Sequence, residues 1–596
     1  MKGLKKSLSL TALTTLAFAA FTLSINEVNA QDDEEVVFNY EDYPETSTND
    51  GEPLGEGVLR IGYVSNEVFV PVFSHIYSGS GTDGDIMTYF TEPLLTYNEN
   101  HQYTNDGPMQ YELNEDDNTI TFTMTEGILW HDGTELTIDH YISNYEVVGH
   151  PDYAGLAGSD DGYMLVEGFE EYRNGEADSI SGIERVDDYT AVFTYKELAP
   201  SLTYGGIPAD AHPYHYYEGV AIEDIPSVDQ SLREPIGFGP YKVTEVLPGE
   251  FVTMERFDDY WRGTPQLDGI EINFIPSSSI LYELEAENID MVFRYPRDQF
   301  QDSQHIEGIE WISAIDPGYN FIGFKLGYFD YDAGEVVYQP DEMKMCDKNL
   351  RLAMYHAIDI QSVGEQFHQG IRWKANSVIT PYYEDFWDET LEAPEYDRDI
   401  ARQILADAGY EDIDGDGFVE TPDGEPLEIT YADMSGGDTQ EALSNYYLQS
   451  WRDIGLNVSF LNGRLIEPTT FYNLVENDDP EIDVFHAGFG AGPDVNPYSL
   501  WGSTAPYNFT RFESEDNTRL LEAGNSQDAL DEDYRIEVYQ EWQNHIADEV
   551  PVIPLFFGAF VVPIDENIVN YSIGYGFNED TLLYKVGFTE LPEDQQ

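Results

Sequence analysis

The chain has 596 residues, of which 115 are Asp or Glu and 27 are Lys or Arg, so its formal net charge at pH 7 is −88. Such an excess of acid excludes a nucleic-acid-binding protein, because phosphate groups need lysine and arginine. Aromatic residues at 14% and apolar residues at 41% are too many for a disordered acidic chain. We therefore predict a folded protein of two or three domains, and a salt-rich habitat in which its charges are screened.

The N-terminus has the pattern of an export signal. Three lysines precede an apolar stretch from Leu8 to Ile25, and small residues stand at the end of Val28-Asn29-Ala30. A membrane span is the alternative, but serine and threonine interrupt the stretch. We predict a signal peptide over residues 1–30, cleaved after Ala30, and a mature protein outside the cytoplasm.

The next residues carry no sign of a lipid anchor. Bacterial lipoproteins have cysteine at the cleavage point, whereas this position is Gln31, and the single cysteine of the chain is Cys346. One cysteine also excludes an internal disulfide. Residues 31–55 are rich in Asp, Glu, Ser, Thr, Asn and Pro, and this composition predicts a disordered acidic leader.

The mature chain contains both strand and helix patterns. A β-rich run at Val58–Val64 predicts a buried strand. Asp347 and Asp397 are candidate N-caps of two amphipathic helices, and apolar stripes predict two further helices over residues 439–454 and 534–548. The fold class is therefore mixed α/β.

An acidic segment after the second of these helices resembles the start of a calcium loop. Oxygen ligands stand at its first, third and fifth positions, glycine at the sixth and a carbonyl at the seventh. The twelfth position, usually a bidentate glutamate, is aspartate. The candidate ligands of a structural calcium ion are Asp412, Asp414, Asp416, Phe418, Glu420 and Asp423. An acidic surface turn is the alternative.

Several blocks, in one consistent order, resemble the extracellular solute-binding proteins of the peptide and nickel importer family, family 5. The blocks are Trp130–Asp139, Pro235–Lys242, Tyr260–Gly263, Glu287–Asp290, Asn349–Asp359, and Arg535–Gln543 with Pro551–Leu555. Together they span nearly the whole mature chain.

This resemblance implies an α/β fold in which two lobes form a hinged clamp, the type II (cluster C) periplasmic-binding-protein architecture, with an additional domain on the first lobe. The implied domains are lobe I at 56–91, 201–317 and 557–596, the additional domain at 92–200, and lobe II at 318–556.

The implied function is to capture oligopeptides by hinge closure and to deliver them to the permease of an ABC importer. The ligand's main chain would supply most of the affinity and water would adapt to its side chains. Nickel chelate, haem and oligosaccharide remain alternative ligands, and a secreted peptide hydrolase remains an alternative class. We expect a monomer in the periplasm or at the cell surface that needs no cofactor.

The resemblance also implies candidate ligand contacts. In the family an aspartate pairs with the peptide's amino group, and in the corresponding segment, Gly490–Pro497, we predict Asp494 for this role, with a turn aspartate as the alternative. The Gly237-Phe238-Gly239 stretch allows close backbone approach and is a candidate cleft wall, with a purely structural role as the alternative. Weaker candidates for the cleft wall, each of which could equally belong to the core, are Glu92, Tyr97, Tyr319, Asn320 and Trp501. Lys325, Arg372 and Lys374 are equal candidates for binding a ligand carboxylate.

Enzyme motifs are absent from the sequence. There is no His-Glu-x-x-His and no Gly-x-Ser-x-Gly, and the single cysteine lacks the sequence context of a nucleophile. We therefore predict that the protein is not an enzyme.

Overall fold

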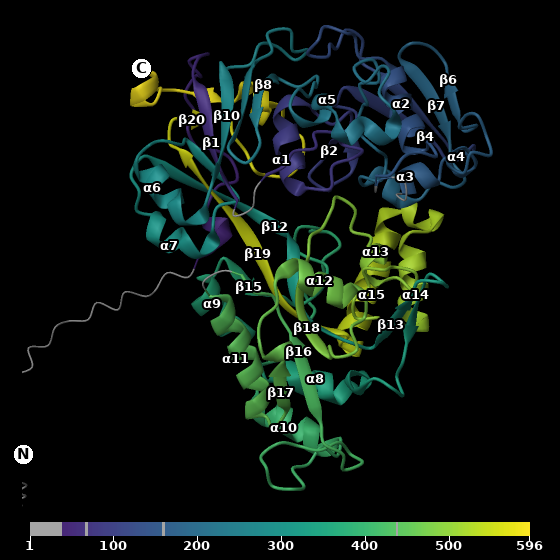
Figure 1. Ribbon diagram of the computed structural model, residues 1–596, viewed down its shortest axis with the longest axis vertical. Coiled ribbons are helices and arrows are strands. Elements are labelled where there is room, and N and C mark those ends of the chain that lie inside the picture. Colours follow the sequence, from purple (N-terminus) through teal and green to yellow (C-terminus); the bar gives the residue numbers. More distant parts are fainter. Residues whose placement is uncertain (1–37, 66–68, 156, 158–160, 437–438) are drawn as a thin grey trace, which may run out of the picture. The chain divides into compact units, whose positions relative to one another are not determined.

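The computed structural model describes residues 38–65, 69–155, 157, 161–436 and 439–596 (Figure 1). The predicted signal peptide and the first seven residues of the predicted leader lie outside this range. None of the described helices is both long and apolar enough to cross a membrane.

One mixed sheet of eleven strands organises the molecule. Its order is β17 (Asn457–Phe460), β16 (Glu428–Ala432), β18 (Val484–Phe489), β12 (Ile309–Phe324), β19 (Val552–Asp565), β11 (Met291–Phe293), β1 (Val58–Val64), β10 (Gly269–Ile275), β9 (Phe251–Arg256) and β8 (Tyr241–Leu247), and β15 (Arg372–Lys374) pairs with β19. The strand predicted at residues 58–64 is confirmed as β1, which runs parallel to β10 and β11.

Two long antiparallel strands, β12 and β19, connect the two halves of this sheet (Figure 1). Their first pairs run from Ile309 with Asp565 to Asp316 with Gly558. The register then shifts between Asp316 and Asn320 and again between Asn320 and Phe321, and from Tyr319 onward β12 also pairs with β18. A paired ladder interrupted at one point is suited to bending there, so the chain crosses between the halves at a natural hinge.

A separate four-stranded sheet lies in the region predicted as the additional domain. Its order is β4 (Met109–Asn114), β5 (Thr119–Met124), β7 (Thr190–Thr194) and β6 (Ile183–Arg185). Helix α2 (Ile138–Val148) packs on it through Tyr141 and Tyr145, whose rings meet Phe193. Two-stranded pairs elsewhere are β2 (Thr96–Tyr97) with β3 (Tyr103–Thr104), β13 (Gly327–Asp330) with β14 (Glu335–Tyr338), and β20 (Ile568–Val569) with β21 (Gly587–Phe588).

The four predicted helices are confirmed. They are α8 (Lys348–His356), α10 (Arg398–Asp407), α11 (Gln440–Asp453) and α15 (Glu532–Glu549). Asp347 and Asp397 cap α8 and α10 as predicted. Asp347 accepts one hydrogen bond from the backbone N–H of Asn349, and Asp397 accepts two from the first turn of α10. The remaining α-helices are α1 (Gly81–Phe90), α3 (Asp161–Met164), α4 (Phe169–Arg173), α5 (Asp229–Leu232), α6 (Ile280–Glu285), α7 (Phe300–Ser303), α9 (Ile360–His368), α12 (Pro468–Glu476), α13 (Tyr498–Trp501) and α14 (Glu515–Gly524).

The disordered leader predicted at residues 31–55 is wrong from residue 38 onward. Phe38 is buried and stacks on Tyr43, and both rings meet Phe300. Ser313 donates its backbone N–H to the carbonyl oxygen of Pro44. Aromatic side chains thus anchor a segment whose acidic composition suggested a solvated chain.

Candidate functional site

A large cavity lies between two chain segments that are distant in sequence. Its volume is about 1040 Å³, at the upper end of the range for pockets that hold small ligands. One wall comes from residues 75–210 and the other from residues 492–526. Both walls carry tyrosine rings and polar side chains, among them Tyr97 and Tyr204 on the first and Asp494 on the second. The cavity therefore has room for an extended ligand with both polar and apolar groups.

Asp494 lines this cavity from the loop between β18 and α13. Tyr383 holds the loop by donating its hydroxyl to the carbonyl oxygens of Gly492 (2.5 Å) and Asp494 (3.2 Å). The Asp494 carboxylate accepts the backbone N–H of Asn496 on Oδ1 at 3.1 Å. The position of Asp494 is compatible with both predicted roles, because its carboxylate stabilises a turn and also borders the cavity.

A buried arginine is the main partner of Asp494. Arg535, on α15, is fully buried and donates from Nη2 to Asp494 Oδ1 at 2.7 Å. Burial acts to lower the pKa of Arg535, but the charge and hydrogen bond of Asp494, together with the nearby Tyr539 and Tyr204, outweigh burial and hold that pKa above its ordinary value. No hydrogen bond from the described residues reaches Asp494 Oδ2. A ligand amine would therefore share the Asp494 carboxylate with Arg535.

The chain segments that carry the two cavity walls meet at a polar contact beside this ion pair, where Glu532 follows the second wall in the chain. Glu532 accepts hydrogen bonds on Oε1 from the Tyr204 hydroxyl at 2.8 Å and from Gln102 Nε2 at 3.2 Å. The Arg535 guanidinium lies over the Tyr204 ring, 4.8 Å from its centre. Gly205 has a positive φ of 100°, and a β-carbon there would collide with Pro493 of the other wall. Glycine at this position thus permits the close approach of the walls.

Glu92 lies away from the large cavity, at a smaller one of about 300 Å³. Its carboxylate accepts hydrogen bonds from Trp261 Nε1 and from the Tyr260 hydroxyl at 3.2 Å, and Arg262 Nε lies 3.8 Å away. Burial raises the pKa of Glu92 to about 7. Glu92 therefore connects the segment after α1 to the Tyr260–Gly263 block. Tyr97 borders both cavities.

The Gly237-Phe238-Gly239 stretch packs against the protein itself. Phe238 is buried, with its ring edge-on to Trp130 at 5.2 Å. A β-carbon at Gly237 would collide with the carbonyl oxygen of Phe90, and one at Gly239 would lie 2.7 Å from the Phe90 carbonyl carbon. The glycines do allow close backbone approach, as predicted, but the neighbour is the end of α1 and not a cavity.

The three remaining cleft-wall candidates lie at or beside the β12–β18 pairing. Tyr319 and Trp501 are buried, and the Trp501 indole N–H donates to the Tyr319 hydroxyl at 3.3 Å. Asn320 is half-buried and pairs with Gly488 across the two strands. The Tyr319 ring also contacts Phe489, the last residue before the cavity loop.

Arg535, Tyr204 and Glu532 were not predicted as site residues. Arg535 stands at the start of one block used for the family resemblance, without any local pattern that indicates a pairing 41 residues away. The Tyr204-Gly205-Gly206 run carried one usable signal, since paired glycines indicate a close approach of backbone segments.

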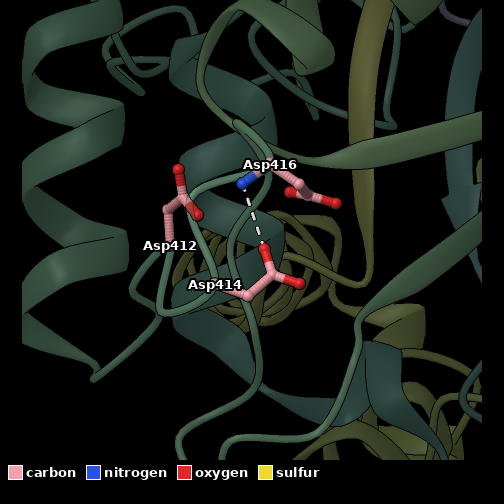
Figure 2. Close-up of side chains that lie close together, drawn as sticks. All are labelled: Asp412, Asp414 and Asp416. Atoms are coloured by element: carbon pink, nitrogen blue, oxygen red, sulfur yellow. Dashed lines mark hydrogen bonds between the residues drawn. The ribbon is translucent and has the colours of Figure 1, made fainter.

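The acidic loop after α10 brings three of its six predicted calcium ligands together (Figure 2). Asp412, Asp414 and Asp416 are exposed, and ligand oxygens from the three lie within 4.8 Å of one another. Figure 2 shows the backbone N–H of Asp416 donating to Asp414 Oδ1, at 3.0 Å. Glu420 is instead buried and accepts the backbone N–H of Ile413 at 2.7 Å. In the described part of the chain, the candidate metal-binding group contains these three aspartates and neither Glu420 nor Asp423.

The chain matches one protein family over most of its length. The model of "Bacterial extracellular solute-binding proteins, family 5 Middle" matches residues 108–509. The oligopeptide-binding protein OppA of Lactococcus lactis subsp. lactis (strain IL1403) is 26% identical over 510 residues, which cover 84% of this chain and 82% of the relative.

Solved structures agree with this match. Lactococcal OppA, complexed with an endogenous peptide in the closed conformation, has a TM-score of 0.78 and 23% identity, covering 89% of this chain and 100% of that one. AppA from Bacillus subtilis, in complex with a nonapeptide, has a TM-score of 0.69 and 20% identity, covering 91% and 100%. These likenesses confirm the predicted fold, the α/β two-lobed clamp of periplasmic binding proteins.

Proposed function

We propose that this chain, which belongs to the bacterial extracellular solute-binding proteins of family 5, captures oligopeptides and delivers them to the permease of an ABC importer. The observation that carries the proposal is the cavity of about 1040 Å³ lined on one side by Asp494. Relatives named as oligopeptide-binding proteins, and neighbours solved with bound peptides, support peptide as the ligand class.

The geometry suits a ligand whose side chains vary. A cavity of this volume leaves space for water around bound side chains, and bridging water adapts to different groups at little cost. Asp494 offers Oδ2 to a peptide's amino group, while Arg535 holds the carboxylate in place through Oδ1. Affinity then comes from features common to all peptides.

Capture requires the two cavity walls to close on the ligand. The walls contact each other through Glu532, Tyr204 and Gln102, and the interrupted β12–β19 ladder supplies a hinge. A ligand that binds both walls favours the closed population. We propose that the permease recognises that closed state.

Further properties follow from the same proposal. Family members are extracellular substrate-binding proteins and not enzymes. For this chain we propose export by the N-terminal signal, attachment to the cell envelope through the importer without a lipid, a monomeric state, no catalytic activity and no nucleic-acid binding. The charge of −88 supports function in concentrated salt.

A mixed peptide pool tests the function. The mature protein is incubated with the pool at high salt, separated from free peptides, and both fractions are analysed by mass spectrometry. We expect intact peptides in the bound fraction. Cleaved peptides would instead support a hydrolase, and a nickel chelate, haem or oligosaccharide on the protein as purified would support one of the alternative ligands.

A further inference from the structure

Two of the three cations considered for a ligand carboxylate already have partners. Lys325 is buried and forms an ion pair with Asp478. Lys374 donates from Nζ to the carbonyl oxygen of Pro394 at 2.9 Å. Arg372 differs from both, because its guanidinium makes no hydrogen bond or ion pair with any residue that the structure describes.

An unpaired, half-buried arginine is unexpected in so acidic a chain. Across the described ranges, Arg464 is the other lysine or arginine whose side chain forms no hydrogen bond or ion pair, and Arg464 is exposed to water. Arg372 is half-buried in β15. Partly removing a charge from water is costly, and Arg372 has no direct ion pair to offset this cost. The nearby charge of Asp316 favours the charged form of Arg372, but Asp316 is already paired with Arg297.

A second guanidinium lies beside Arg372 at the hinge. Arg372 pairs with Gly558 on β19, which in turn pairs with Asp316 on β12, so the three residues form a row across three strands. A β-carbon at Gly558 would lie 3.2 Å from Arg372 Cγ and 3.4 Å from Arg297 Nη1. Glycine thus makes room for two arginines over one strand position. Arg297 forms an ion pair with Asp316, so this group carries one net positive charge.

Two further hydrogen-bonding groups near Arg372 also lack partners. His368 Nε2, at the end of α9, and the Tyr447 hydroxyl, on α11, are buried without a hydrogen-bond partner among the described residues. Burial and then the charge of Arg372 lower the pKa of His368 to about 3. Burial raises the pKa of Tyr447 well above 10. Both groups are therefore neutral at pH 7 and able to donate a hydrogen bond to an anion.

We propose that Arg372 binds a carboxylate of the ligand, with Arg297, His368 and Tyr447 as supporting groups. This inference rests on the proposed peptide-binding function and extends it to ligand specificity. The carboxylate is either the peptide's C-terminus or an acidic side chain, since an arginine recognises both in the same way.

The position of Arg372 is consistent with a ligand that also reaches Asp494. Two residues after Asp316, a β-carbon at Gly318 would lie 2.9 Å from the carbonyl oxygen of Phe489, the last residue of β18. The loop that carries Asp494 begins at the next residue. The cationic group and Asp494 thus lie on segments that meet across the paired strands β12 and β18, and their charges are opposite to those of a peptide's two ends.

Peptide titrations with Arg372→Gln test the proposal. The matched control is Arg464→Gln, which removes the same charge from an exposed, unpaired position. Three hexapeptides are compared at constant ionic strength: one with a free C-terminus and neutral side chains, one amidated with a single glutamate, and one amidated and neutral. A lost charge-assisted contact predicts an affinity for one of the first two that is about 10- to 100-fold lower in Arg372→Gln.

The pattern of losses identifies the source of the carboxylate. Loss confined to the free C-terminus assigns Arg372 to that end, and loss confined to the glutamate peptide assigns it to a side chain. Arg464→Gln and the neutral amidated peptide should change by less than about twofold. An Arg372→Gln variant that weakens all three peptides equally, or none, would overturn the proposal.

A second measurement separates this site from the proposed function and needs no folded variant. Arginine side-chain ¹⁵N signals of the wild type are followed while acetate replaces chloride at constant ionic strength. We expect acetate to shift a half-buried arginine signal that is missing from the Arg372→Gln spectrum, or that is assigned by paramagnetic labelling if that variant does not fold. Acetate binding without peptide binding would reject the proposed function alone, and no shift would reject the site.

Discussion

Asp494 and the Asp412–Asp416 loop are both acidic sites predicted from short motifs, but they are built in different ways. The loop carboxylates are exposed and accept hydrogen bonds from their own backbone within five residues. Asp494 instead pairs with Arg535, which lies 41 residues away in sequence and is fully buried. A local motif thus carries its own geometry, whereas a site between distant elements depends on partners that no local pattern reveals.

The largest effect should come from breaking the Asp494 pair. Replacing Asp494 with Ala leaves the buried Arg535 without its counter-charge, and the loss of one partner of a buried ion pair costs about 3–5 kcal/mol. The free energy of unfolding, measured by urea denaturation, gives this value. Asp412→Ala, which removes an exposed carboxylate, is the control and should cost less than about 1 kcal/mol. Equal losses in the two variants would remove the distinction between the sites.

Glu92 is an intermediate case, a half-buried acid that lies beside a cation and accepts hydrogen bonds from two aromatic side chains. Its pKa rises from 4.5 to about 7 on folding, so the folded protein holds a proton that the unfolded chain releases. This contribution to stability is complete below pH 4.5 and is lost as the pH rises to about 7, a change of about 3 kcal/mol.

Comparing Glu92→Gln with the wild type isolates that pH dependence. Gln keeps an acceptor for Trp261 and Tyr260 but does not titrate, so the stability difference between the two proteins should change across pH 4.5–7. Urea denaturation at several pH values measures it. A difference that stays constant over this window would show that Glu92 keeps an ordinary pKa.

Ligand recognition should depend on the charge of Asp494 and on a free N-terminus of the peptide. Asp494→Asn keeps the size of the side chain and an acceptor oxygen but removes the charge that attracts an amine. We expect affinity for a peptide with a free N-terminus to fall about 10- to 100-fold, with little change for its N-acetylated form. Calorimetric titration of both peptides checks this, and equal losses for the two would exclude the amine contact.

The smallest effect should come from the acidic loop, where we propose a structural calcium ion. With a dissociation constant of about 10⁻⁴–10⁻³ M, as in extracellular calcium modules, 1 mM calcium would stabilise the protein by about 0.4–1.4 kcal/mol. Thermal melting after chelation, with calcium or an equal concentration of magnesium, measures this. Asp414→Asn should abolish the calcium response, and a wild type that responds equally to both ions would contradict a calcium site.

The sequence was most informative where structure is local. Strand β1 and helices α8 and α10 follow from apolar patterns and aspartate caps, because the interactions that start them lie within a few residues. Local composition gave a wrong prediction at residues 38–55. The acidic composition indicated disorder, but three aromatic rings anchor this segment. The fold was predicted from the family resemblance, which rests on sequence blocks spread along the whole chain.

The site was only partly predictable, because burial decides what each candidate does. Asp494 and Tyr97 line the cavity, but Glu92 and Phe238 are buried in contacts with the protein itself. Arg372 was one of three equal candidates for binding a ligand carboxylate, and it is the one that remains because Lys325 and Lys374 already have partners in the protein. Neither burial nor pairing can be derived from residue types at a given spacing.

The most direct test of peptide capture in the large cavity is to fill that cavity. Ser499 is exposed and lines it, so Ser499→Trp should obstruct the ligand, while Ser278→Trp places the same side chain on an exposed surface elsewhere. Calorimetric titration of a hexapeptide should show at least a roughly tenfold loss of affinity for Ser499→Trp and wild-type affinity for Ser278→Trp. Wild-type affinity in Ser499→Trp would contradict this cavity as the binding site.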